Sequence, residues 1–190
     1  MEAFLVSLST VALAEMGDRT QLLSLLLATR FRASWPILAG VFVATLANHA
    51  LAGVIGALIG QQLKPAILDA AVGISMVGMS LWVLKPDALD GNDDAPTRKG
   101  VFLTTLVAFF IAEIGDKTQI ATVALAAGYS NLLAVVAGTT CGMLAANAPV
   151  IFLGNAFAGR LPLRAIHYTA TALLLGIGVA FIYRAIHNWP

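Results

Sequence analysis

Charge is scarce in this sequence. Of its 190 residues only 11% are charged, whereas 59% are hydrophobic and the mean hydropathy is +0.86. Soluble globular domains contain about 25% charged and about 45–50% apolar residues, so this composition excludes a soluble globular protein. A membrane span needs about 20 mostly apolar residues. The chain is therefore predicted to be an all-α integral membrane protein.

Cysteine is almost absent, and neither sign of charge is in excess. The one cysteine, Cys141, excludes a disulfide framework and a cysteine-cage metal site. Because 11 Lys and Arg stand against 10 Asp and Glu, no basic or acidic surface points to nucleic acid as a partner. The short polar segments leave no room for a nucleotide-binding or soluble catalytic domain, so we expect the function to lie within the bilayer.

Hydrophobic runs broken by charge, proline or glycine predict six transmembrane helices. Their ranges are 3–28, 35–60, 66–84, 101–127, 132–156 and 165–184. The first run follows Met1-Glu2-Ala3-Phe4, which lacks the positive region of a secretory signal. We therefore expect this first run to be a retained span.

One heptapeptide occurs twice in the chain. EMGDRTQ at residues 15–21 returns as EIGDKTQ at residues 113–119, with five of seven positions identical at an offset of 98. We infer a duplication into three-helix repeats at 1–84 and 101–190, joined by an acidic linker at 85–100. An odd number of spans per repeat inserts the second copy upside down, as in the inverted-topology repeats of many secondary transporters.

Lysine and arginine are distributed unevenly between the two faces that these spans predict. One face collects Arg30, Arg32, Lys85, Arg98, Lys99, Arg160 and Arg164, and the other has Lys64 and Arg184. Cytoplasmic loops carry the excess of positive residues. The linker is therefore predicted to be cytoplasmic, with both termini outside.

Both motifs lie near the middle of a predicted span, which places Glu15, Asp18, Glu113 and Asp116 near the bilayer centre. An aspartate, lysine or arginine there costs roughly 2.5–3.5 kcal/mol, so an intramembrane ionisable cluster predicts a functional site. In a continuous helix, a spacing of three residues puts each Glu about 60° from its Asp. Each motif would thus present a pair of carboxylates on one face.

Other motif residues are expected to shape this site. Gln21 and Gln119 would extend the acid-bearing faces by another turn and add oxygen ligands. Gly17 and Gly115 each weaken a helix interior by about 1 kcal/mol relative to alanine. They are therefore candidate break points, since transporters use discontinuous helices to expose backbone carbonyls to ions.

Three polar residues in the second and fifth spans are further candidates. Asn48 and Asn147 occupy matching places and either complete the ion shell or make a helix–helix hydrogen bond. His49 is a candidate proton-transfer group or a softer ligand that favours Mn²⁺ over Ca²⁺. A packing role with a carbonyl partner is the interpretation that we favour for this histidine.

For two sets of residues outside the motifs, the sequence predicts an interfacial or a packing role. Asp69, His167 and His187 lie near span ends, and all three are expected to be solvated or interfacial. The spaced glycine pairs, Gly56-x3-Gly60 and Gly138-x3-Gly142, fit either the seam of a homodimer or close packing inside one bundle.

Together the motifs hold four carboxylates and two cations, Arg19 and Lys117, for a net charge of −2. A divalent ion would neutralise this charge, and oxygen ligands suit hard ions such as Ca²⁺ and Mn²⁺. Zn²⁺ and Cu⁺ are disfavoured because no Cys or His cluster lies beside the motifs.

Arg19 and Lys117, four residues after Glu15 and Glu113, are expected to pair with these carboxylates when no metal is bound, and so to tune their charge. Ion pairing that merely holds the bundle together is the structural alternative.

EMGDRT and EIGDKT resemble the paired Glu-x-Gly-Asp-(Lys/Arg)-(Thr/Ser) signatures of the Golgi Gdt family, the second calcium:cation antiporter family, whose bacterial members include MneA-type manganese exporters. The resemblance extends over the whole chain in size, helix count and duplication. It implies exchange of Mn²⁺ or Ca²⁺ for protons, with the four motif acids as metal ligands. Since the chain lacks the longer N-terminal region of eukaryotic members, we expect it in the plasma membrane of a prokaryote.

The sequence thus predicts a secondary transporter for metal homeostasis that exchanges a divalent cation, Mn²⁺ ahead of Ca²⁺, for protons without a resident cofactor. The expected partners are the metal ion and the lipid bilayer, with a homodimer left open. A passive cation channel is the alternative, and it predicts uncoupled flux. An exporter of a small organic cation would need an aromatic-lined cavity that the motifs do not supply. An enzyme is not expected, because no nucleophile and base pair accompanies the acids.

Overall fold

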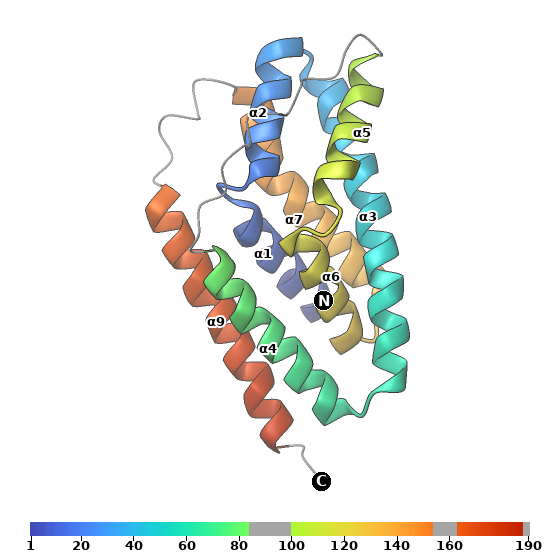
Figure 1. Cartoon of the computed structure of the whole chain (residues 1–190), viewed down its shortest axis with the longest axis vertical. Helices are drawn as coiled ribbons and strands as arrows, with labels where there is room; N and C mark the ends of the chain where they lie inside the picture. The colour runs from blue at the N-terminus through green and yellow to red at the C-terminus, as the bar shows by residue number, and fades with distance from the viewer. Residues whose placement is uncertain (84–99, 154–162, 188–190) are drawn as a thin grey trace.

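The structure is a computed structural model, and it describes residues 1–83, 100–153 and 163–187. Its helices are α1 (Glu2–Glu15), α2 (Arg19–Phe31), α3 (Ser34–Gln62), α4 (Pro65–Val83), α5 (Val101–Glu113), α6 (Lys117–Gly128), α7 (Leu132–Leu153) and α9 (Leu163–His187). They form an elongated bundle (Figure 1). The predicted linker at 85–100 lies outside the described residues except for Gly100.

The described part of the chain is all helical apart from short connections, which confirms the all-α part of the prediction. Helices lie in all six stretches predicted as spans, but the first stretch holds α1 and α2 and the fourth holds α5 and α6. Among the described residues, α3 and α7 are each long and apolar enough to cross a membrane by length and composition.

Both divided stretches are interrupted at the glycine of the motif. Gly17 has a φ of 80° and Gly115 a φ of 76°, in the left-handed region that side chains with a Cβ rarely adopt. The motif glutamate ends one helix and the motif aspartate caps the next helix at its N-terminus. The expectation that Glu and Asp share one continuous helix face is therefore wrong, because the backbone turns between them.

The long helices of each half pack on the interrupted helices of the other half. A Cβ added at Gly40 of α3 would lie 2.9 Å from the carbonyl oxygen of Phe102 in α5. A Cβ added at Gly138 of α7 would meet the carbonyl oxygen of Phe4 in α1. These two pairs are related by the same offset of 98 residues as the motifs. Equivalent residues thus form the two crossings, and their small size lets the backbones approach closely.

The spaced glycines serve packing within the chain. A Cβ at Gly56 would meet the carbonyl oxygen of Val123, and one at Gly60 would lie 2.6 Å from the carbonyl oxygen of Ala127. Both contacts join α3 to α6, and Gly142 packs in the same way on the backbone of α1. The homodimer seam is therefore the wrong interpretation of these glycines.

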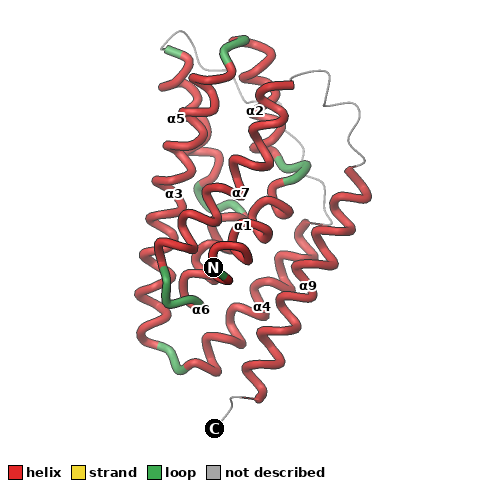
Figure 2. The backbone as a smooth tube through the Cα atoms, turned by 180° about the vertical axis from the view of Figure 1, so that it is seen from behind, coloured by secondary structure: helices red, strands yellow, loops and turns green. Residues whose placement is uncertain are grey.

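α4 and α9 lie side by side along one flank of the bundle (Figures 1 and 2). Their contact is reciprocal: a Cβ at Gly73 would lie 2.8 Å from the carbonyl oxygen of Gly178, and one at Gly178 would lie 2.9 Å from that of Gly73. The pair also contacts the rest of the bundle, α4 through α6 and α9 through α1. The pair thus packs against the flank of the bundle formed by α6 and α1.

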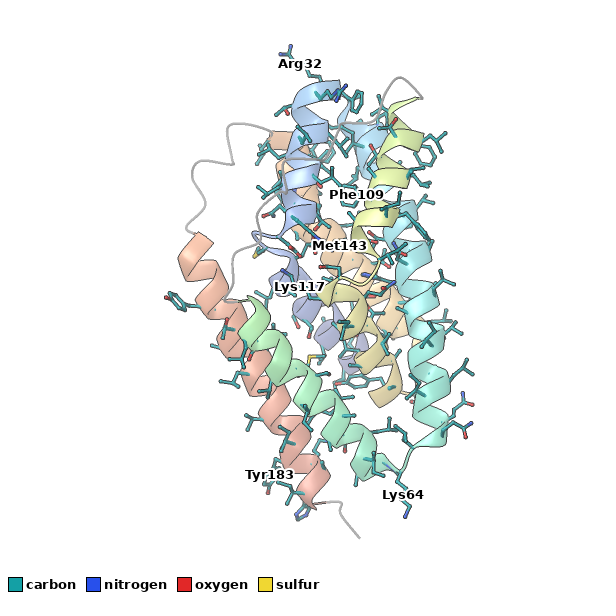
Figure 3. All side chains as sticks on the ribbon, in the orientation of Figure 1. Arg32, Lys64, Phe109, Lys117, Met143 and Tyr183 are labelled. Carbon is teal, nitrogen blue, oxygen red and sulfur yellow. The ribbon has the colours of Figure 1, made fainter. Side chains whose placement is uncertain are left out.

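Figure 3 shows Arg32 and Lys64 at opposite ends of the molecule. Arg30 lies in the last turn of α2, close to Arg32, whereas Arg184 lies in the last turn of α9, at the end that carries Lys64 and Tyr183. Several other residues named above lie outside the described residues, namely Lys85, Arg98, Lys99 and Arg160, as do the side chains of Arg164 and His167.

Candidate metal centre

Asp18 and Asp116 are positioned by the helices that they begin. Asp18 Oδ1 accepts a hydrogen bond from the backbone N–H of Arg19 at 2.7 Å. Asp116 Oδ2 accepts bonds from the backbone N–H and the hydroxyl of Thr118 at 3.4 and 3.2 Å. A carboxylate at a helix N-terminus is favoured by the free N–H groups and by the helix dipole. The aspartates are therefore held at the interruptions, in the middle of the bundle.

Three carboxylates from the two motifs come together at the interruptions. Glu15, Asp18 and Asp116 each offer an oxygen, and these oxygens lie within 4.8 Å of one another. The residues are 0%, 1% and 3% exposed. Oxygens on opposite sides of one Ca²⁺ ion are about 5 Å apart, since each lies about 2.3–2.6 Å from the ion. The spacing therefore fits a single hard cation.

The motif cations make ion pairs that run between the two halves of the chain. Lys117 Nζ lies 2.9 Å from Asp18 Oδ2, and both side chains are buried. Arg19 Nη2 lies 3.6 Å from Asp116 Oδ1 and donates to the carbonyl oxygen of Ala112 at 3.0 Å. Each cation thus neutralises the aspartate of the other motif.

This arrangement corrects the predicted pairing of Arg19 with Glu15 and of Lys117 with Glu113. The prediction assumed a continuous helix, in which residues four apart are neighbours on one face. The chain leaves the helix after each glutamate and begins a new helix after the aspartate. The spacing of four residues therefore no longer sets which groups meet.

Glu113 is buried but stands apart from the three clustered carboxylates. Its Oε1 accepts a hydrogen bond from Thr45 Oγ1 at 2.5 Å, and its Oε2 accepts one from Asn48 Nδ2 at 2.9 Å. Both donors belong to α3, and Asn48 Nδ2 also donates to the carbonyl oxygen of Phe110. The fourth motif acid is therefore held by the first half of the chain.

Asn147 lies beside Glu15 in the corresponding way. Its Nδ2 donates to Glu15 Oε1 at 3.4 Å and to the carbonyl oxygen of Met143 at 3.1 Å. Its Oδ1 accepts a bond from Ser24 Oγ at 2.6 Å. Glu15 Oε2 has no hydrogen-bond partner among the described residues. Each asparagine thus contacts the motif glutamate of the other half, as a hydrogen-bond donor between helices.

Gln21 and Gln119 brace the interruptions in this structure. Gln21 Oε1 accepts from the backbone N–H of Gly17 at 2.8 Å, and Gln119 Oε1 accepts from that of Gly115 at 2.8 Å. Gln21 Nε2 donates to the carbonyl oxygen of Ala146 at 2.9 Å. Their oxygens therefore satisfy backbone groups that an unbroken helix would have satisfied.

Thr45 and Ser24 contact residues of the site but were not predicted from the sequence. Each lies three residues from a predicted site residue on the same helix, Thr45 before Asn48 and Ser24 after Gln21. This spacing places them on the same face as those residues, and it is the signal that identifies them.

His49 is fully buried, but neither ring nitrogen has a hydrogen-bond partner among the described residues. The expected carbonyl partner of this histidine is therefore not found there.

Buried acidic groups between interrupted helices are typical of proteins that move cations through a membrane. A family model described as "Divalent cation/proton antiporter GDT1" matches the chain twice, over residues 3–91 and 101–189. The chain belongs to this family, which confirms the resemblance inferred from the two motifs. The family comprises cation transporters rather than enzymes.

Individual relatives cover nearly the whole chain. A "Putative manganese exporter" of Vibrio cholerae is 49% identical over 181 residues, which are 95% of this chain and 90% of that protein. A GDT1-like protein of Synechocystis is 28% identical over 100% of this chain and 97% of its own length. The yeast "Divalent cation/proton antiporter GDT1" is 23% identical over 97% of this chain and 85% of its own length. The comparison with solved structures found no match.

Proposed function

We propose that this protein exchanges a divalent metal ion, Mn²⁺ ahead of Ca²⁺, for protons and exports the metal from the cytoplasm. The observation that carries the proposal is the buried group of Glu15, Asp18 and Asp116, which joins both motifs within 4.8 Å. A site built from oxygens suits hard divalent ions. The name of the Vibrio cholerae relative, a putative manganese exporter, supports the choice of Mn²⁺ and of export.

In the metal-bound protein, Glu15, Asp18 and Asp116 hold the ion. Lys117 is bound to Asp18 at 2.9 Å in this structure, so an arriving ion has to displace its ammonium group. Glu113 joins the ion after it leaves its two donors on α3. The Glu113 carboxylate can leave the Thr45 hydroxyl and the Asn48 amide for the metal because these donors are neutral, whereas the metal ion carries two positive charges.

Proton coupling follows from the same carboxylates. They bind the metal when deprotonated and release it when protons return from the other side, so one site alternates between the two cargoes. The burial of the clustered carboxylates supports an occluded site rather than an open pore. Coupled exchange is therefore favoured over the passive channel, in which the flux would be independent of the pH gradient.

We further propose six spans in two inverted repeats, residues 1–84 and 101–190, with the linker at 85–100 in the cytoplasm. The double match of the family model supports the duplication, as does the offset of 98 residues that relates the two glycine crossings. Arg30 and Arg32 then lie at the cytoplasmic end of the bundle, and both termini lie on the outer side of the plasma membrane of a prokaryote. Alternating access arises as the repeats rock around the site.

Transport into proteoliposomes tests this function. Vesicles that are acidic inside should take up Mn²⁺ faster than vesicles without a pH gradient, and Ca²⁺ more slowly than Mn²⁺. Glu15→Gln should abolish the uptake, because the variant keeps the shape of the side chain but not its charge. Glu2→Gln is the matched control, since Glu2 is an exposed glutamate at the start of the same helix. Uptake that is indifferent to the pH gradient would show a channel instead.

A further inference from the structure

A second polar region lies at the end of the bundle opposite to Arg32. A pocket of about 480 Å³ opens there between α3, α4, α6 and α9. The residues of its wall that bear on its chemistry are Gln61, Asp69, Gly128, Tyr129 and Arg184. None of these belongs to the two motifs, so the central site does not account for the pocket.

Asp69 of α4 is the acidic group of this pocket, and its environment differs from the sequence prediction. It was expected to be solvated or interfacial, but it is only 5% exposed because α4 packs against α9 along its length. Arg184 Nε lies 3.7 Å from Asp69 Oδ2. The arginine side chain is 52% exposed and lies over the Phe181 ring, 5.1 Å from its centre. A buried carboxylate thus faces a cation that extends in from the surface.

The backbone adds to the negative potential of the pocket. α3 ends at Gln62 and α6 ends at Gly128, and both final turns contribute to the pocket wall. The last carbonyl groups of a helix have no partner within the helix, and the C-terminus carries about half a negative charge. Carboxylate and carbonyl oxygens together are the ligands that hard divalent cations take in proteins.

We propose that this pocket is a second binding site for the divalent cation, which Asp69 and the terminal carbonyl groups of α3 and α6 take up when Arg184 withdraws. The proposal rests on the proposed function, in which this end faces outward and the exported ion leaves through it. α6 begins at the central site with Lys117 and ends at the pocket with Gly128. Its 12 residues separate the two sites by about 18 Å.

Two substitutions that remove the same ion pair distinguish a cation site from a structural bridge. Asp69→Asn and Arg184→Gln both eliminate the ion pair between α4 and α9, so a purely structural role predicts the same effect for both. A cation site predicts opposite effects. Asp69→Asn removes a ligand and should weaken Mn²⁺ binding, whereas Arg184→Gln removes the competing charge and should strengthen it.

The measurement is equilibrium binding of Mn²⁺ to the purified full-length chain in detergent, with free Mn²⁺ followed by electron paramagnetic resonance. We expect two classes of site in the wild type. Asp69→Asn should lose the weaker class, and Arg184→Gln should tighten it by about fivefold, as expected for a partly exposed charge. Lys64→Gln is the control for Arg184→Gln, because it removes the same charge from the same end at a residue outside the pocket wall.

The two sites can fail independently in this experiment. Glu15→Gln should remove the tighter class and leave the weaker class in place. If the wild type shows a single class that Glu15→Gln removes, the pocket proposal is wrong and the central site stands. Shifts of the same sign for Asp69→Asn and Arg184→Gln would also overturn the pocket proposal. A strengthened site in Arg184→Gln cannot result from misfolding, so this variant keeps the test decisive.

Discussion

At the scale of single residues, the two motif cations occupy different environments. The Lys117 side chain is 4% exposed and lies against a buried aspartate, whereas the Arg19 side chain is 45% exposed. Removing one partner of a buried ion pair destabilises a protein by about 3–5 kcal/mol, and an exposed pair contributes about 0–1 kcal/mol. The motifs differ here only by a Lys/Arg exchange, but Lys117 forms a buried ion pair and Arg19 a partly exposed one, so we expect Lys117 to contribute more to stability.

Lys117→Met should raise the affinity for Mn²⁺ and lower the stability of the metal-free protein. The ammonium group no longer competes with the metal for Asp18, but without metal the buried carboxylate has lost its cation. Thermal unfolding, followed with and without Mn²⁺, should show a large destabilisation that the metal reverses. Arg19→Met is the matched control and should shift the unfolding temperature much less. Weaker Mn²⁺ binding by Lys117→Met would show that the lysine assists the metal rather than replacing it.

At the scale of elements, each motif builds an interruption rather than a helix face. The glycine supplies a positive φ, the aspartate caps the following helix, and the glutamine satisfies the N–H of the glycine. These parts are adjacent in sequence, so the interruption is specified locally. The sequence could identify the candidate break point for that reason. The side-chain amide of Gln21 is held in addition by the carbonyl oxygen of Ala146, which lies 125 residues away in the chain.

Gly115→Ala should destabilise the protein by about 1–2 kcal/mol, the cost of a left-handed conformation for a residue with a Cβ. A Cβ at this position meets no atom within 4 Å, so the effect arises from the backbone alone. Gly78→Ala is the control, because its Cβ is equally unhindered but lies in the helix α4. That variant should be stabilised by up to about 1 kcal/mol. Equal denaturation midpoints for the two variants would argue against the interruption in α5 and α6.

At the scale of the whole molecule, the fold depends on close crossings between the two halves. α7 crosses α1 at Gly138, and α3 crosses α5 at Gly40. These crossings bring Asn147 to Glu15 and Asn48 to Glu113. The central site therefore requires both halves, even though each half carries its own motif.

Gly138→Ala should destabilise the protein by about 1–3 kcal/mol, as overpacking does in a close-packed interior. The new Cβ would meet the Phe4 carbonyl oxygen, which is backbone and cannot rotate away. Gly176→Ala is the control, because no atom lies within 4 Å of its Cβ. Unfolding monitored by circular dichroism should separate the two variants. A Gly138→Ala protein as stable as the wild type would mean that α7 and α1 lie further apart.

Hydropathy and the repeated motif determined the helical fold class, the six helical stretches, the four acids and the family. These features depend on composition and on residues close together in sequence, so no tertiary contact is needed to read them. Tertiary structure alone decided which groups meet. Lys117 pairs with Asp18 and Thr45 binds Glu113 because helices far apart in sequence cross at small residues. Asp69 is buried for the same reason, since α9 covers a face of α4 that would otherwise be open.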